Sequence, residues 1–211
     1  MSWQGRRRDG YHHGNLREAL VAAALELMEE KGPSGFTFAE AARAAGVSAA
    51  APYRHYSSRD DLMAEVARRG FERFTHQLAQ AWDDGQPRPL EAFYRVGQAY
   101  LTFARKEPAY YTAMFEAQIP PSYNRELQQA ADAAFGVLRD SCQALAATLP
   151  ADRRPPSLMM SLHIWSLAHG IASLFGRGDK ARRSLPMAPE DLLEAGVLVY
   201  LQGLGFGDTG T

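Results

Sequence analysis

The stretch that decides the fold runs from Thr37 to Leu62 and reads TFAEAARAAGVSAAAPYRHYSSRDDL. Its beginning predicts a helix start, because a Thr hydroxyl can accept a hydrogen bond from the main chain three residues on while the Glu40 side chain reaches back. Gly46 then lies in a three-residue turn and can take the positive φ that a sharp reversal requires. Ser48 is placed to cap a second helix to about Tyr56. The stretch therefore predicts two short helices joined by a tight turn.

Longer helices are expected on both sides of this stretch. Apolar residues at helical spacing predict a helix from about Asn15 to Lys31, which Gly32 and Pro33 end. Ser58 can cap a further helix that runs to about Trp82. A supporting helix followed by two short helices across a glycine turn has the geometry of a helix-turn-helix.

The rest of the chain is also predicted to be helical. Ala and Leu greatly outnumber the β-branched residues, which favours helix over strand. Five further helices are separated by segments rich in Pro, Gly and charge: Pro89–Lys106, Pro108–Phe115, Ser122–Leu149, Ser157–Phe175 and Pro189–Leu204. The expected fold is all-α with nine helices, a three-helix helix-turn-helix head followed by a helical bundle.

Composition excludes several classes of protein. With 23 Lys and Arg against 24 Asp and Glu, the net charge of −1 excludes a uniformly basic nucleic-acid coat. The single cysteine, Cys142, can form neither an intramolecular disulfide nor a Cys-based zinc cluster, and it fits the reducing cytoplasm. No apolar run approaches the length of a bilayer span, and residues 1–14 contain no export signal, so no membrane partner is expected. We find no catalytic motif, metal site or cofactor site, and we expect that the chain is not an enzyme.

The chain resembles the TetR family of bacterial transcriptional regulators. The resemblance covers Tyr11 to about Phe74 and is carried by Ala45-Gly46-Val47-Ser48, then Tyr53-Arg54-His55-Tyr56, then Ser58-Arg59-Asp60-Asp61-Leu62. Tyr11-His12-His13-Gly14-Asn15-Leu16-Arg17 and Trp165-Ser166-Leu167-Ala168-His169-Gly170 are similar to the branch named for a Trp-His-Gly carboxy-terminal domain. The resemblance implies a recognition helix from Ser48 to His55 and contacts with double-stranded DNA. The expected contact residues are Thr37, Ser48, Ala49, Ala50, Ala51, Tyr53, Arg54, His55 and Arg59.

The chain departs from the common family pattern in the recognition helix. Ala49, Ala51 and Pro52 stand where a Lys, a Thr and a Leu are frequent. Alanines supply no bidentate donor to a base, although an alanine methyl can meet a thymine methyl. Proline within the first turn is expected to be tolerated there.

A basic arm precedes the first helix. Arg6, Arg7 and Arg8 are expected to add phosphate or minor-groove contacts, as homeodomain arms do. The alternative interpretation is that these arginines are merely solvated.

The carboxy-terminal part is predicted to hold a small-molecule pocket, because aromatic and Met side chains are concentrated there. The alternative for each residue is ordinary core packing, and for His169 we expect a hydrogen-bonded structural role. His163 and His169 are six residues apart, a spacing that does not suit a metal. The candidate pocket residues are Tyr100, Phe103, Tyr111, Met114, Phe115, Met159, His163, Trp165 and His169.

The last two helices carry more apolar surface than one buried stripe needs, which predicts a homodimer. Family resemblance implies the same pairing. We expect DNA binding from residues 1–58, and ligand binding and dimerisation from residues 59–211, with the fourth helix as the link. The predicted function is a homodimeric repressor that an unknown small apolar effector releases from a palindromic operator. A constitutive DNA-binding regulator without effector, or an activator, is the alternative.

Overall fold

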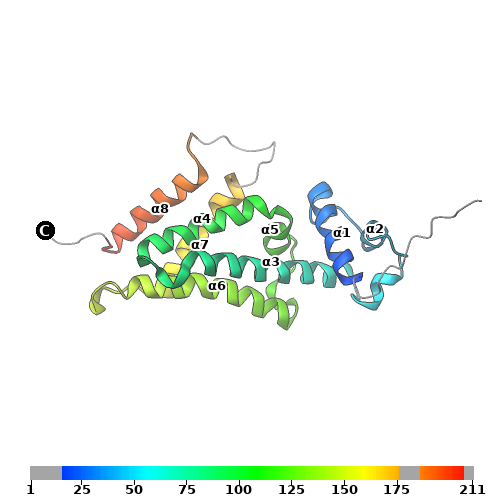
Figure 1. The fold of residues 1–211 in the computed structure, drawn as a ribbon, viewed down its shortest axis with the longest axis horizontal. Coiled ribbons are helices and arrows are strands. Elements are labelled where there is room, and N and C mark those ends of the chain that lie inside the picture. Colours follow the sequence, from blue (N-terminus) through cyan, green and yellow to red (C-terminus); the bar gives the residue numbers. More distant parts are fainter. Residues whose placement is uncertain (1–15, 176–185, 207–211) are drawn as a thin grey trace, which may run out of the picture. The chain divides into compact units, whose positions relative to one another are not determined.

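The computed structural model describes residues 16–175 and 186–206, where it contains eight α-helices, four short 3₁₀ helices and no strand (Figure 1). The prediction of an all-α fold is confirmed. The α-helices are α1 (Leu16–Lys31), α2 (Phe38–Ala44), α3 (Arg59–Trp82), α4 (Pro89–Lys106), α5 (Pro108–Phe115), α6 (Arg125–Ala146), α7 (Ser157–Phe175) and α8 (Pro189–Gly203). The 3₁₀ helices are η2 (Ala51–Arg54), η3 (Asp83–Gly85), η4 (Pro121–Tyr123) and η5 (Ala151–Arg153). The chain divides into two compact units. The first ends at Met63 and the second begins at Ala64.

The prediction of an α-helix from Ser48 to Tyr56 is wrong. The described residues therefore contain eight α-helices where nine were expected. Only η2 forms there, and no side chain caps it. Two of its hydrogen bonds span three residues: Ala51 N–H donates to the Ser48 carbonyl at 3.0 Å and His55 N–H to the Pro52 carbonyl at 2.9 Å. Pro52 has no N–H to donate to the Ser48 carbonyl, so the first α-helical hydrogen bond expected after Ser48 is missing.

Apolar residues of α1, α2 and the beginning of α3 form the core of the first unit. Leu20 and Ala24 of α1 and Leu62 of α3 are completely buried, and Tyr56 is buried among the same elements. Gly46 has φ +72°, as the sharp turn after α2 requires. The sequence predicted this turn.

Local side-chain hydrogen bonds fix where two helices of the first unit begin. The Thr37 hydroxyl accepts from Glu40 N–H at 3.2 Å, and the Glu40 carboxylate accepts from Thr37 N–H at 2.8 Å, which confirms the predicted capping box of α2. Ser58 Oγ accepts from Asp61 N–H at 3.1 Å, so Ser58 caps α3 as expected.

The second unit is a helical bundle in which α4 and α7 are central. α7 packs against α6 and α8, and α4 packs against α5, α6, α7 and α8. Helix α6 begins at Arg125, later than the predicted Ser122, because Asn124 caps it by accepting from Leu127 N–H at 2.8 Å.

One helix has the length and apolar composition of a possible membrane span: α7, over Ser157–Phe175. A third of the most apolar stretch of 18 residues in α7 is buried inside the structure. Core helices of soluble proteins can have the same length and composition, so this helix alone is weak evidence for a membrane span.

Candidate nucleic-acid interface and effector cavity

The segment from Ser48 to Arg59, which follows the Gly46 turn, contains no acidic residue and is largely exposed. Ser48, Ala49 and Ala50 are exposed, and Ala51 is half-buried at the beginning of η2. No Asp or Glu occurs between Ser48 and Arg59. Small side chains there allow close approach of another molecule, and the absence of carboxylates suits an anionic one.

η2 and the residue after it direct three polar side chains outward. Tyr53, Arg54 and His55 are exposed, Tyr53 by 62% of its surface. The ring of Tyr53 is held edge-on against Phe38, with centroids 5.0 Å apart, while most of the side chain stays exposed. Pro52 is buried and anchors the short helix to the core. This turn thus brings together three of the predicted contact residues.

Two other predicted contact residues make hydrogen bonds within the first unit. Arg59 Nε donates to the Phe36 carbonyl at 3.0 Å, and the same guanidinium donates to the Pro33 carbonyl. The Arg59 guanidinium also lies over the ring of Phe36, 4.7 Å from its centroid. Thr37 is occupied by its capping box. Phosphate contacts by Arg59 and Thr37 stay predictions, and the expected contacts of Arg6, Arg7 and Arg8 lie outside the described residues.

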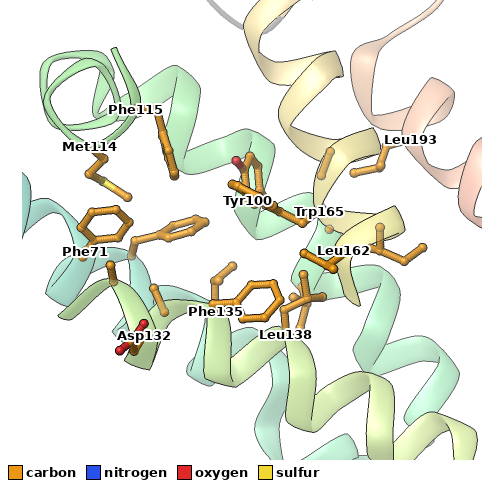
Figure 2. Close-up of a pocket in the computed structure, with 18 of the residues that line it drawn as sticks. Phe71, Tyr100, Met114, Phe115, Asp132, Phe135, Leu138, Leu162, Trp165 and Leu193 are labelled. Atoms are coloured by element: carbon orange, nitrogen blue, oxygen red, sulfur yellow. The ribbon is translucent and has the colours of Figure 1, made fainter. Parts of the chain in front are cut away.

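A cavity of about 750 Å³ lies in the second unit (Figure 2). This volume is in the range of small-molecule sites. Side chains from α3, α4, α5, α6, α7 and α8 line it, and Figure 2 shows the side chains of Phe71, Tyr100, Phe115 and Phe135 around the opening between these helices. Four predicted pocket residues are among the lining residues: Tyr100, Met114, Phe115 and Trp165.

The other predicted pocket residues do not line the cavity. Phe103 and Tyr111 are buried behind its wall, and Met159 is exposed on α7. His163 is also exposed, and its Nδ1 lies 3.1 Å from the Tyr200 hydroxyl of α8. His169 makes the expected structural hydrogen bonds.

These hydrogen bonds form a polar cluster in an otherwise apolar wall. His169 Nδ1 lies 3.0 Å from the Tyr100 hydroxyl and 2.8 Å from the Tyr111 hydroxyl. The ring of Trp165 lies against the His169 ring, with centroids 5.8 Å apart. Burial lowers the pKa of the His169 imidazole and raises the pKa of Tyr100 well above its ordinary value, so both groups are neutral near pH 7. The cluster positions the two cavity residues Tyr100 and Trp165 without adding charge.

Sequence reasoning missed most of the cavity wall. Phe71 and Phe74 come from α3, Phe135 and Leu138 from α6, and Leu193 from α8. These residues occupy ordinary apolar positions of amphipathic helices, and only the packing of the helices decides which of them face an open space. No pattern in the sequence distinguishes them from core residues.

Neither catalysis nor metal binding finds support in the described part of the chain. Burial raises the pKa of the Cys142 thiol to about 11, so the thiol is protonated and inert near pH 7. Among the described residues, no group of three His, Cys, Asp or Glu side chains could hold a metal ion.

Comparison with known proteins assigns both units to one family. Residues 20–66 match the model of bacterial regulatory proteins of the tetR family. Residues 93–200, about half of the chain, match the model of the tetracyclin repressor-like C-terminal domain. The chain belongs to the TetR family. It is therefore a DNA-binding transcriptional regulator and not an enzyme, and the second match contains the Trp165 and His169 stretch noted in the sequence.

Individual relatives agree with this assignment. The chain is 24% identical over 198 residues to the uncharacterized HTH-type transcriptional regulator YobS of Bacillus subtilis, covering 90% of this chain and 93% of that protein. A solved structure of a protein of unknown function from Rhodococcus sp. RHA1 is 27% identical, with a TM-score of 0.74 over 93% of this chain and 98% of that one. The TetR family regulator PfmR from Thermus thermophilus shares the fold at 18% identity, with a TM-score of 0.66 over 87% of this chain and 97% of that one.

Proposed function

We propose that this TetR-family regulator is a homodimeric repressor that leaves a palindromic DNA site when a small, largely apolar effector enters the cavity. The exposed, acid-free surface from Ser48 to His55 carries the proposal. Tyr53 and Arg54 can donate hydrogen bonds to phosphate oxygens there, while the small side chains before them allow a groove to approach. Residues 1–58, with the arm at Arg6, Arg7 and Arg8, would form the DNA-binding domain, and the protein would act in the cytoplasm.

Exposed apolar residues of α7 and α8 support the proposed dimer. Large apolar side chains on these two helices keep about half of their surface exposed: Leu158 55%, Met159 44%, Leu162 43%, Leu174 56%, Leu198 44% and Val199 69%. Exposed apolar surface of this extent on a soluble chain favours pairing with a second copy. A twofold axis would then place two copies of the Ser48–His55 surface about 34 to 36 Å apart, which matches one turn of DNA.

The cavity supports regulation by an effector, and α3 supplies side chains to both units. Leu62 of α3 is buried in the first unit, whereas Phe71 and Phe74 of the same helix line the cavity. An effector that contacts these rings can therefore act on the helix that also belongs to the DNA-binding unit. A coupling of about 1 to 3 kcal/mol would lower DNA affinity roughly 5- to 150-fold.

The test begins with selection of a binding site from random duplex DNA, followed by titration of the selected site at several salt concentrations. Arg54→Ala should weaken binding and reduce the slope of log affinity against log salt by about 1 per protomer, because one phosphate contact is lost. Arg139→Ala is the matched control, since Arg139 is exposed on α6 in the second unit. Equal salt slopes for Arg54→Ala and the wild type would contradict the proposed surface.

A further inference from the structure

The charged side chains that line the cavity all have the same sign. Asp132 of α6 and Glu190 and Glu194 of α8 line it, and no Lys, Arg or His occurs among the described residues of its wall. A carboxylate or phosphate ligand would therefore find no cationic partner within this wall. The lining does not suit an anionic effector.

Asp132 and Glu194 form no ion pair with another described residue, whereas Glu190 does. Glu190 is paired with Arg105, which lowers the pKa of the Glu190 carboxyl. Asp132 accepts a hydrogen bond from the neutral Gln128 side chain at 2.8 Å. The charge of Glu194 adds to burial in raising the pKa of Tyr94, another lining residue. Asp132 and Glu194 are exposed, so they border the solvent-facing edges of the cavity.

Aromatic rings form much of the remaining wall. The rings that line the cavity are those of Phe71, Phe74, Phe93, Tyr94, Tyr100, Phe115, Phe135 and Trp165. Figure 2 shows Asp132 and Phe71 on one side of the cavity and Leu193, the neighbour of Glu194, on the other. The faces of aromatic rings attract cations, most strongly where water is excluded. The acidic edges and the aromatic interior of the cavity thus both favour a cationic ligand.

The polar cluster in the wall adds no opposing charge. His169 stays neutral near pH 7, and it shares its Nδ1 between the Tyr100 and Tyr111 hydroxyls. Tyr100 and Trp165 can therefore contact a ligand as uncharged hydrogen-bonding groups and aromatic surfaces.

We propose that the cavity takes a lipophilic cation, an apolar or aromatic body carrying an amine or quaternary ammonium that lies beside Asp132 or Glu194. The proposal rests on the proposed effector function and names the chemical class of that effector. The cavity volume agrees with this ligand class, because about 750 Å³ accommodates a drug-sized molecule.

The experiment uses three probes with the same tail and different head charge: decyltrimethylammonium, decanol and decanoate, each below its micelle concentration. Binding to the full-length protein is measured by calorimetry and by tryptophan fluorescence, since Trp165 lines the cavity. We expect decyltrimethylammonium to bind at least ten-fold more tightly than decanoate and more tightly than decanol. Asp132→Asn/Glu194→Gln should reduce binding of the cation at least five-fold and leave decanol unchanged, and the single variants identify which end holds the ammonium.

Asp140→Asn/Glu126→Gln is the matched control, because it removes two exposed acids of α6 that lie outside the cavity lining. It should leave all three affinities unchanged. The proposal is overturned if decanoate or decanol binds as tightly as the cation, if both double variants lose cation binding equally, or if no probe binds.

Titration of the selected DNA site in the presence of each probe separates the two proposals. If decanoate binds best and releases DNA, the cationic class is wrong and the effector function stands. If the cation binds best without changing DNA affinity, the cationic class stands and the effector function is wrong.

Discussion

The shared hydrogen bond of His169 leads to a quantitative prediction about the cavity wall. Tyr111 is completely buried, and its hydroxyl lies 2.8 Å from His169 Nδ1, while the Tyr100 hydroxyl lies 3.0 Å from the same atom. Tyr111→Phe or Tyr100→Phe alone removes one hydroxyl and leaves Nδ1 with the other, so each should lower the free energy of unfolding by about 1 kcal/mol. The double variant removes both partners. It should cost about 1 kcal/mol more than the sum of the single variants, because the partly buried Nδ1 is left without either tyrosine.

Urea unfolding followed by tryptophan fluorescence measures these differences, since Trp165 lies in the same wall. Tyr110→Phe is the matched control: Arg73 lies over the Tyr110 ring, 5.1 Å from its centroid, and phenylalanine keeps that ring. The control should change stability by less than about 0.5 kcal/mol. Additive effects of Tyr100→Phe and Tyr111→Phe, or a Tyr111→Phe variant as stable as Tyr110→Phe, would refute the shared hydrogen bond.

Single features of the fold give three further predictions. Gly46→Ala should lower the free energy of unfolding by about 1 to 2 kcal/mol, because φ is +72° at that position. Gly136→Ala within α6 should instead raise it by about 0.5 to 1 kcal/mol. Urea titrations compare the two variants, and equal effects would contradict the turn geometry. The Lys31 hydrogen bond and the Thr37 cap lower the pKa of Glu40 to about 2 from an ordinary value of 4.5, so its stabilisation is complete above pH 4.5 and is lost as the pH falls through about 2. Unfolding midpoints of the wild type should therefore fall more steeply than those of Glu40→Gln between these pH values, and parallel curves would contradict this. Val199→Lys places a charge on the proposed dimer face and should weaken self-association by about 2 kcal/mol or more in sedimentation velocity, while Gln143→Lys at an exposed position of α6 should not.

Features set by neighbouring residues were predictable from the sequence. The Thr37 and Glu40 capping box, the Gly46 turn and the Ser58 cap each involve residues at most three positions apart, so their chemistry is visible in the order of the chain. Pro52 was equally visible, but its effect was underestimated. With no N–H at that position, the expected recognition helix is reduced to η2.

Features set by tertiary packing could not be predicted in the same way. The carbonyls that accept from Arg59 belong to Pro33 and Phe36, more than twenty positions away, and nothing in the local sequence indicates them. Phe103 and Phe135 are both aromatic residues on amphipathic helices, yet only Phe135 lines the cavity. The rotation of each packed helix decides this difference, and the periodicity of the sequence does not specify it.

Hydroxyl-radical footprinting of the full-length protein on its selected DNA tests the central claim most directly, because it maps where the Ser48–His55 surfaces meet the duplex. The predicted result is two protected segments centred about one helical turn apart, both lost in Arg54→Ala at a concentration where Arg139→Ala still protects. A single protected segment, or protection that Arg54→Ala leaves intact, would contradict it.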